Sequence, residues 1–168
     1  VDTFEATQPT ALAALHMDPP VPMPAMGRSA LLDTLPDPVV DALVDAVAEG
    51  PARMLTSVEL RHLGGALDRD AAAPTARAHA LMYAVAVAAS PAAAANPNPE
   101  AIAAARAAFE SLAAAVAPVR SSREIRTFTE AAADPERLFG AELSRLRVAK
   151  QYWDATDLIH ANHPVLPR

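Results

Sequence analysis

Glu59, Arg61 and His62 are the residues of this sequence best suited by type and spacing to bind a ligand. They stand in the stretch VELRHLGG, just before the glycine pair Gly64-Gly65. On a strand, Glu59 and Arg61 share one face, where the simplest outcome is an exposed ion pair that contributes about 0–1 kcal/mol. The alternative is a polar wall of a substrate pocket, because a glycine pair lets a ligand or another backbone approach closely.

Other chemical devices are scarce in the sequence. His160 and His163 form the pattern H-x-x-H, but no third or fourth ligand is spaced to complete a zinc site, so we predict no metal. The five glycines form no dinucleotide-binding or phosphate-binding loop, and neither G-x-S-x-G nor H-E-x-x-H occurs. The absence of cysteine excludes disulfides and thiolate chemistry. We expect Tyr83 and Trp153 to pack in the core rather than to stack on a cofactor.

The composition predicts a globular domain that binds neither nucleic acid nor a membrane. The net charge is −6 and the arginines are scattered, whereas nucleic-acid binding requires a basic footprint. The most apolar run, residues 78–95, is mostly alanine and is interrupted by Ser90 and Pro91, so we do not expect it to span a membrane. The chain opens with no signal-peptide pattern, and we expect a cytoplasmic location.

Three helices are predicted from apolar residues that recur every three or four positions. Asp37 and Asn98 are the expected caps of two of them, since each is followed by a proline, which fits the first helical position. The expected helices span residues 38–49, 99–116 and 141–153. In the first helix, the side chains expected to face the core are Val40, Leu43, Val44 and Val47.

Strands are predicted where apolar and polar residues alternate. The expected strands lie within residues 54–67, 81–87 and 123–130; over 81–87 the many alanines make a helix the competitor, but the β-branched alternation favours a strand. An edge strand and a helical turn after Pro9 are expected first, followed by a proline-rich arm at residues 19–24. The order helix, strand, strand, helix, strand, helix predicts an α+β fold in which an antiparallel sheet packs against helices.

The C-terminal stretch LRVAKQYWDATDLIHANHPV resembles the closing signature of a known family. That family is the FAD-linked oxidases of the vanillyl-alcohol-oxidase superfamily, in their berberine-bridge-enzyme-like branch. VELRHLGGAL is similar to the family's substrate-domain strand that ends in Gly-Gly-Ala, and PTARAHA resembles its Thr-Ala-Phe-x-His-Arg run through His79. Ala155 departs from the usual proline. The signature residues matched here are Arg145, Leu146, Lys150, Tyr152, Asp154, Leu158 and Asn162.

The resemblance implies that the chain is part of an oxidase that passes a hydride from an alcohol or similar C–H donor to FAD, and then electrons to O₂. The family's FAD-binding domain lies N-terminal to everything matched here. Residues 1–145 would then be the C-terminal half of the substrate domain, and residues 146–168 the tail that meets the flavin domain. Asn162 would lie near FAD, and we place Glu59, Arg61 and His62 on the side of a small-molecule substrate.

Two departures from the family keep a second hypothesis open. Ile125 and Thr127 stand where the family commonly has Tyr-x-Asn, and Arg69 stands where some plant members have a catalytic glutamate, so neither role carries over and the catalytic base is left unassigned. The alternative is a stand-alone α+β binding or interaction module that has lost flavin chemistry. A third reading, a helical interaction domain, requires the alanine-rich stretches to be helical throughout. The chain alone should bind no FAD, and we expect it to self-associate or to depend on the complementary polypeptide.

Overall fold

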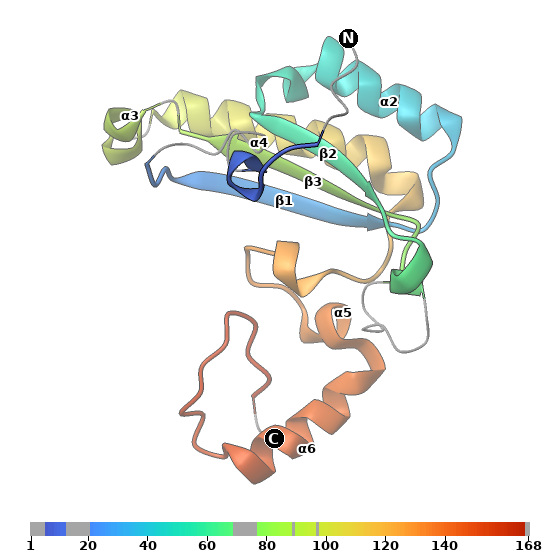
Figure 1. The fold of residues 1–168 in the computed structure, drawn as a ribbon, viewed down its shortest axis with the longest axis vertical. Coiled ribbons are helices and arrows are strands. Elements are labelled where there is room, and N and C mark those ends of the chain that lie inside the picture. Colours follow the sequence, from blue (N-terminus) through green and yellow to red (C-terminus); the bar gives the residue numbers. More distant parts are fainter. Residues whose placement is uncertain (1–5, 13–20, 69–76, 89, 97, 167–168) are drawn as a thin grey trace.

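A three-stranded antiparallel sheet lies at the centre of the structure (Figure 1). The structure is a computed structural model, and it describes residues 6–12, 21–68, 77–88, 90–96 and 98–166. The strands are β1 (Ala25–Leu32), β2 (Ser57–His62) and β3 (Ala80–Val87), in the spatial order β1-β3-β2. Helices accompany the sheet, so the predicted α+β class is confirmed.

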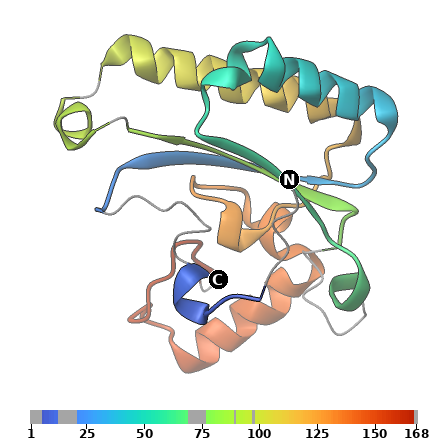
Figure 2. The same ribbon diagram turned by 45° about the horizontal axis from the view of Figure 1, so that its top comes forward.

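Two long helices cover one face of the sheet, as Figure 2 shows. They are α2 (Asp37–Ala48) and α4 (Pro99–Val116). The short α3 (Pro91–Ala95) precedes α4, while α5 (Pro135–Phe139) and α6 (Leu143–Trp153) lie beyond the opposite face. Single 3₁₀ turns connect these elements: η1 (Pro9–Ala11), η2 (Pro51–Met54), η3 (Gly65–Asp68), η5 (Ala117–Val119), η6 (Arg126–Phe128) and η7 (Gly140–Glu142).

The helix starts follow local chemistry. Asn98 caps α4 as predicted, since its Oδ1 accepts a hydrogen bond of 2.9 Å from the backbone N–H of Glu100. In α2 the cap is Pro36 rather than Asp37, and Val39 and Leu43 are the buried side chains. The predicted apolar face of α2 was therefore wrong in part, and Val44 and Val47 are 56% and 39% exposed.

The strand predictions were correct for β2 and β3 and wrong elsewhere. Residues 123–130 contain the turn η6 instead of a strand. Thr129 Oγ1 donates a hydrogen bond of 2.8 Å to the carbonyl of Ile125, and this local bond competes with the backbone hydrogen bonds of a β-sheet. β1 was not predicted, because its second half is buried on both faces and so lacks alternation. The helical turn after Pro9 is confirmed as η1, while the expected edge strand at the chain start lies outside the described residues.

The core has one apolar cluster on each face of the sheet. On the helix face, Leu32, Met82 and Leu112 pack among many alanines, which let α4 approach the sheet closely. On the opposite face, Leu31 and Leu81 pack with Leu63. The segment Pro99–Val119 is long and apolar enough to cross a membrane by length and composition alone, a test that a core helix also passes, and here one side of it packs on the sheet.

Candidate functional site

A row of polar side chains crosses the sheet on the face opposite the long helices. Ser29 of β1 and Glu59 of β2 both stand opposite Tyr83 of β3 in the strand register, so the three residues project from the same face. The neighbouring row, Leu31, Leu81 and Arg61, is apolar except for its last member. A few polar side chains beside apolar ones can orient a small molecule, so we take this face as the candidate site.

The turn η6 is fixed on this face by three contacts. Ser29 Oγ donates a hydrogen bond of 2.7 Å to the carbonyl of Phe128. The Phe128 ring meets the Tyr83 ring edge to face, with centroids 5.0 Å apart. The guanidinium of Arg61 lies 4.8 Å from the centroid of the same phenyl ring. These contacts bring Glu130, two residues further on, over β1 and β3.

Glu130 holds the centre of the candidate site. Its Oε2 accepts a hydrogen bond of 2.7 Å from the backbone N–H of Gly27, and its Oε1 lies 3.2 Å from the Tyr83 hydroxyl, which donates to it. A Cβ at Gly27 would lie 2.1 Å from Glu130 Oε1, so a side chain at this position would displace the carboxylate from where it lies. Burial raises the pKa of Tyr83 above its ordinary value, and the negative charge of Glu130 raises it further.

We predict that replacing Glu130 by glutamine lowers the pKa of Tyr83 toward the ordinary value of about 10. The neutral amide no longer repels a phenolate, so burial remains as the main cause of the raised pKa, beside the smaller opposing effects of Glu59 and Arg61. Ultraviolet titration of tyrosinate in a Tyr152→Phe background, which leaves Tyr83 as the only tyrosine, measures this pKa. Glu142→Gln, remote from Tyr83 and paired with Arg145, is the matched control. An unchanged Tyr83 pKa in Glu130→Gln would contradict the contact.

The structure separates the three residues that the sequence grouped as substrate-binding. Glu59 and Arg61 form a two-pronged ion pair on the polar face, with two N–O distances of 2.9 Å and side chains 40% and 47% exposed. His62 stands opposite Ala80 in the register and projects from the helix face, where its ring lies 5.2 Å from that of His79. Adjacent strand residues point to opposite faces, so His62 cannot share a pocket wall with Arg61.

Asn162 lies on the other side of Glu130. The tail returns to the sheet because His163 Nε2 lies 2.7 Å from the carbonyl of Thr129, within hydrogen-bond distance. Asn162 and Glu130 line one open hollow of about 510 Å³, together with Arg126, Thr127, Thr129, Phe139, Ala161 and His163. The tail residue predicted near a cofactor and the polar row of the sheet therefore meet around a carboxylate that the sequence reasoning had not selected.

A compact turn after α6 gives the tail its direction. Lys150 Nζ lies 2.5 Å from Asp154, 2.6 Å from Asp157 and 2.8 Å from the carbonyl of Ile159. Asp154 also accepts the backbone N–H groups of Leu158 and Ile159 at 2.7 and 2.9 Å. Hydrogen bonding by Lys150, followed by that from the Ile159 N–H, lowers the pKa of Asp154 to about 2, and the two aspartates raise the pKa of Lys150.

We predict that this turn loosens as the pH falls from about 4 to about 2. The pKa of Asp154 is depressed in the folded chain, so its contribution is complete above the ordinary value of 3.8 and is lost as the pH falls through about 2. The pKa of Lys150 is raised, so this side chain stays charged throughout the range and only Asp154 changes its charge within this pair. Fluorescence of Trp153, which adjoins the turn and is the only tryptophan, should report the change. Asp154→Asn should remove this transition; a transition that persists in that variant would contradict the assignment.

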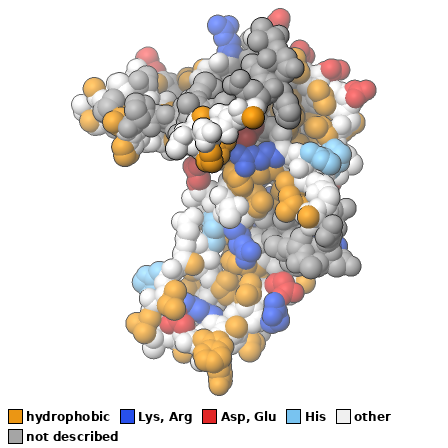
Figure 3. Space-filling model, in the orientation of Figure 1, with side chains coloured by type: hydrophobic (Ala, Val, Ile, Leu, Met, Phe, Trp, Pro, Cys, Tyr) orange, Lys and Arg blue, Asp and Glu red, His pale blue; other side chains and the backbone are white. Residues whose placement is uncertain are grey.

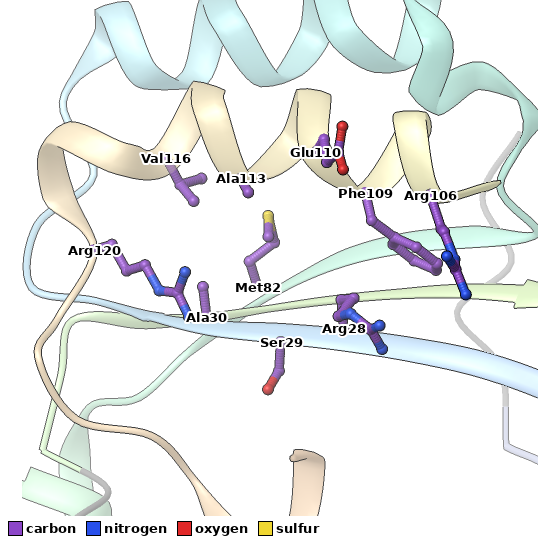
Figure 4. A pocket seen from close by; sticks show the side chains of 10 residues that line it. All are labelled: Arg28, Ser29, Ala30, Met82, Arg106, Phe109, Glu110, Ala113, Val116 and Arg120. Carbon is purple, nitrogen blue, oxygen red and sulfur yellow. The ribbon is translucent and has the colours of Figure 1, made fainter. Parts of the chain in front are cut away.

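A second hollow of about 510 Å³ lies on the helix face, between β1 and α4. Figure 4 shows Arg28, Arg106 and Arg120 around it, with Phe109 and Glu110 on the helix above. The Arg28 guanidinium lies 5.6 Å from the centroid of the Phe109 ring. Three cations and one carboxylate make this hollow attractive to anions, but none of the predicted site residues lines it.

In the part of the chain that the structure describes, no group of three histidine, aspartate or glutamate side chains is placed to hold a metal ion. His160 and His163, which form the H-x-x-H pattern, are engaged separately. His160 lies 4.0 Å from Asp157, and His163 contacts the carbonyl of Thr129. No protein-family model matches this chain, and no curated protein matches it.

Proposed function

We propose that this chain is the C-terminal substrate-domain portion of a FAD-dependent oxidoreductase, a berberine-bridge-enzyme-like oxidase of an alcohol or a similar C–H donor that passes electrons to O₂. The observation that carries the proposal, beside the sequence resemblance, is the exposed apolar surface of its tail. Tyr152, Trp153, Leu158 and Ile159 are 77%, 81%, 82% and 76% exposed. We call these four residues the tail patch.

The tail patch needs a partner. Tryptophan was expected in the core, yet Trp153 lies on the surface, with its ring edge to face with that of Tyr152 at 4.8 Å. Apolar side chains gather over the end of α6 and the tail at the bottom of Figure 3. Contiguous exposed aromatic and aliphatic side chains are typical of a protein–protein contact. The partner that we propose is the upstream FAD-binding domain of the same protein, because the patch adjoins the matched signature residues Lys150 and Asp154.

FAD itself would be held mainly by that upstream domain. The two glycines of positive φ among the described residues, Gly65 and Gly140, stand apart, so they build no phosphate-binding loop. From this chain, Asn162 is the residue that we place toward the flavin. When bound, FAD supplies the hydride acceptor of the oxidation.

The chain's own residues would position the substrate and take its proton. The Glu59–Arg61 pair can bind polar groups of the substrate at the edge of the polar face. Glu130 is the carboxylate best placed to accept a hydroxyl proton, since it lies between the polar row and the hollow of Asn162. The Tyr83 hydroxyl and the Gly27 N–H orient its two oxygens.

One observation favours the second candidate, a binding module without flavin chemistry. Ile125 occupies a position where the family commonly has a tyrosine, and its side chain packs against the apolar cluster of Leu31 and Leu81. A partly buried aliphatic residue there supplies no acid or base to a substrate.

The test is to purify the product of the whole reading frame that contains this sequence, beside the 168-residue chain alone. We expect the longer product to carry flavin and to consume O₂ with an alcohol substrate, and the shorter chain to do neither. Glu130→Gln in the longer product should reduce turnover by about 10²–10⁴-fold, with Glu142→Gln as the control. A longer product without flavin, or stoichiometric FAD binding by the shorter chain, would overturn the proposal.

A further inference from the structure

The outer edge of β1 is occupied within the chain itself. In an antiparallel sheet each residue directs its N–H and C=O to one side, and the side alternates along the strand. The Gly27 N–H bonds Glu130, and the Leu31 carbonyl accepts a hydrogen bond of 2.8 Å from the N–H of Ser121. An isolated bridge between Leu32 and Arg120 extends this cover. A strand from another molecule therefore meets obstacles at both ends of β1.

The outer edge of β2 is open as far as the described residues go. The backbone N–H and C=O groups of the odd-numbered residues of β1 point away from β3. Through the strand register, the N–H and C=O groups of residues 57, 59 and 61 of β2 then point toward β3. Their neighbours direct N–H and C=O away from the sheet, and no backbone partner on this side is found among the described residues. The outward-facing residues are Val58, Leu60 and His62. An edge of this kind is a template for pairing with another strand.

The sequence of β2 is complementary to itself. When two β2 strands are paired antiparallel with Leu60 at the centre, Glu59 of each copy stands opposite Arg61 of the other. Both side chains project from the polar face, where they can exchange charge partners across the seam. The same register aligns the outward-facing residues, so about six backbone hydrogen bonds can form.

Apolar side chains are exposed on the helix side of the sheet. Leu60 projects toward the helix side with Val58 and is 42% exposed. Met54 in η2 and Val44 and Val47 in α2 are 45%, 56% and 39% exposed, and both elements pack on that same side of the sheet. Large side chains left in water on one side of a molecule favour association.

We propose that two copies of this chain pair through the outer edges of β2, in the register centred on Leu60, and form one continuous sheet. The two-fold axis passes through the Leu60 pair, perpendicular to the sheet. The long helices of both copies then lie on one face, and the polar row runs across both copies on the other. This inference does not rest on the proposed oxidase function, because it uses only the edge of β2 and its charge pattern.

The test is to reverse the charges at positions 59 and 61 and to measure dimerisation of the 168-residue chain by sedimentation equilibrium. Glu59→Arg and Arg61→Glu each place two like-charge pairs across the seam, and each should raise the dissociation constant of the dimer by about tenfold or more. An equimolar mixture of these two variants should form a heterodimer, since every cross-seam pair is then opposite in charge. The double variant should recover the native homodimer. If the variants acted only by losing the Glu59–Arg61 pair within each copy, mixing them would not restore dimerisation, and dimerisation would not depend on which variant is the partner.

Two further variants separate the edge from other contacts. Leu60→Pro removes an outward N–H that bonds no backbone group of the described residues, and it should abolish dimerisation while circular dichroism stays native. Arg145→Glu, which reverses one charge of the exposed pair with Glu142, should leave the dimer unchanged. A native chain that is monomeric at all concentrations overturns the proposal. So does a dimer that survives Leu60→Pro or one that is lost in Trp153→Ala, which would assign the contact to the tail patch.

Discussion

Replacing Leu112 by alanine should lower the free energy of unfolding by about 3 kcal/mol. Leu112 is 1% exposed in α4 and packs in the apolar cluster between the helices and the sheet. Alanine is the better helix former, so helix propensity slightly offsets the loss and any destabilisation comes from lost packing. Many neighbours in this cluster are already alanines, which cannot extend to fill the space left by an isobutyl group. Urea denaturation followed by circular dichroism measures the change.

Leu158→Ala is the matched control, since the same atoms are removed from a side chain that is 82% exposed. Its free energy of unfolding should change by less than about 0.5 kcal/mol. A domain of this size has a total stability of about 5–15 kcal/mol, so the two variants should differ clearly in their midpoints. Equal midpoints for the two variants would contradict the described packing of α4.

The second large effect concerns the tail patch and rests on the proposed function. In the longer product, Trp153→Ala should increase local opening of the tail by about 30-fold or more, because a buried tryptophan at the centre of an interface typically contributes 2 kcal/mol or more. Hydrogen-exchange mass spectrometry on peptides from residues 146–166 measures the opening. In the 168-residue chain alone, where Trp153 is 81% exposed, the same substitution should change the exchange little.

Leu12→Ala serves as the control for this experiment, since Leu12 is a 51% exposed apolar residue that follows η1, outside the tail patch. It should leave the exchange of the tail unchanged in both proteins. If Trp153→Ala altered the tail equally in the short chain and in the longer product, the patch would stabilise the tail itself rather than dock on another domain.

Elements specified by nearby residues were predictable from the sequence. The start of α4 depends on Asn98 and on the proline that follows it, two neighbours whose effect is local. β3 could be recognised by its β-branched alternation in spite of its alanines, because its two faces meet different surroundings. The ion pair of Glu59 with Arg61 followed from two-residue spacing on one strand face.

Elements that depend on distant partners were not predictable. β1 has no alternation because Leu31 and Leu32 are buried on opposite faces, and only its pairing with β3 makes it a strand. Residues 123–130 alternate like a strand, yet the contacts of Phe128 with Ser29 and Tyr83 hold them as a turn. In both cases the deciding partners lie far away in the chain.

By itself, the sequence determined the α+β class, the long helices, the two strands β2 and β3, and the exposed Glu59–Arg61 pair, since periodicity and capping act within a few residues. Only the tertiary structure separated His62 from that pair, brought Trp153 to the surface and placed Glu130 between Tyr83 and the Gly27 N–H. The physical reason is that 103 residues separate Gly27 from Glu130. A hydrogen bond over that distance forms only after the sheet and the turn η6 have packed, and no local spacing in the sequence encodes it.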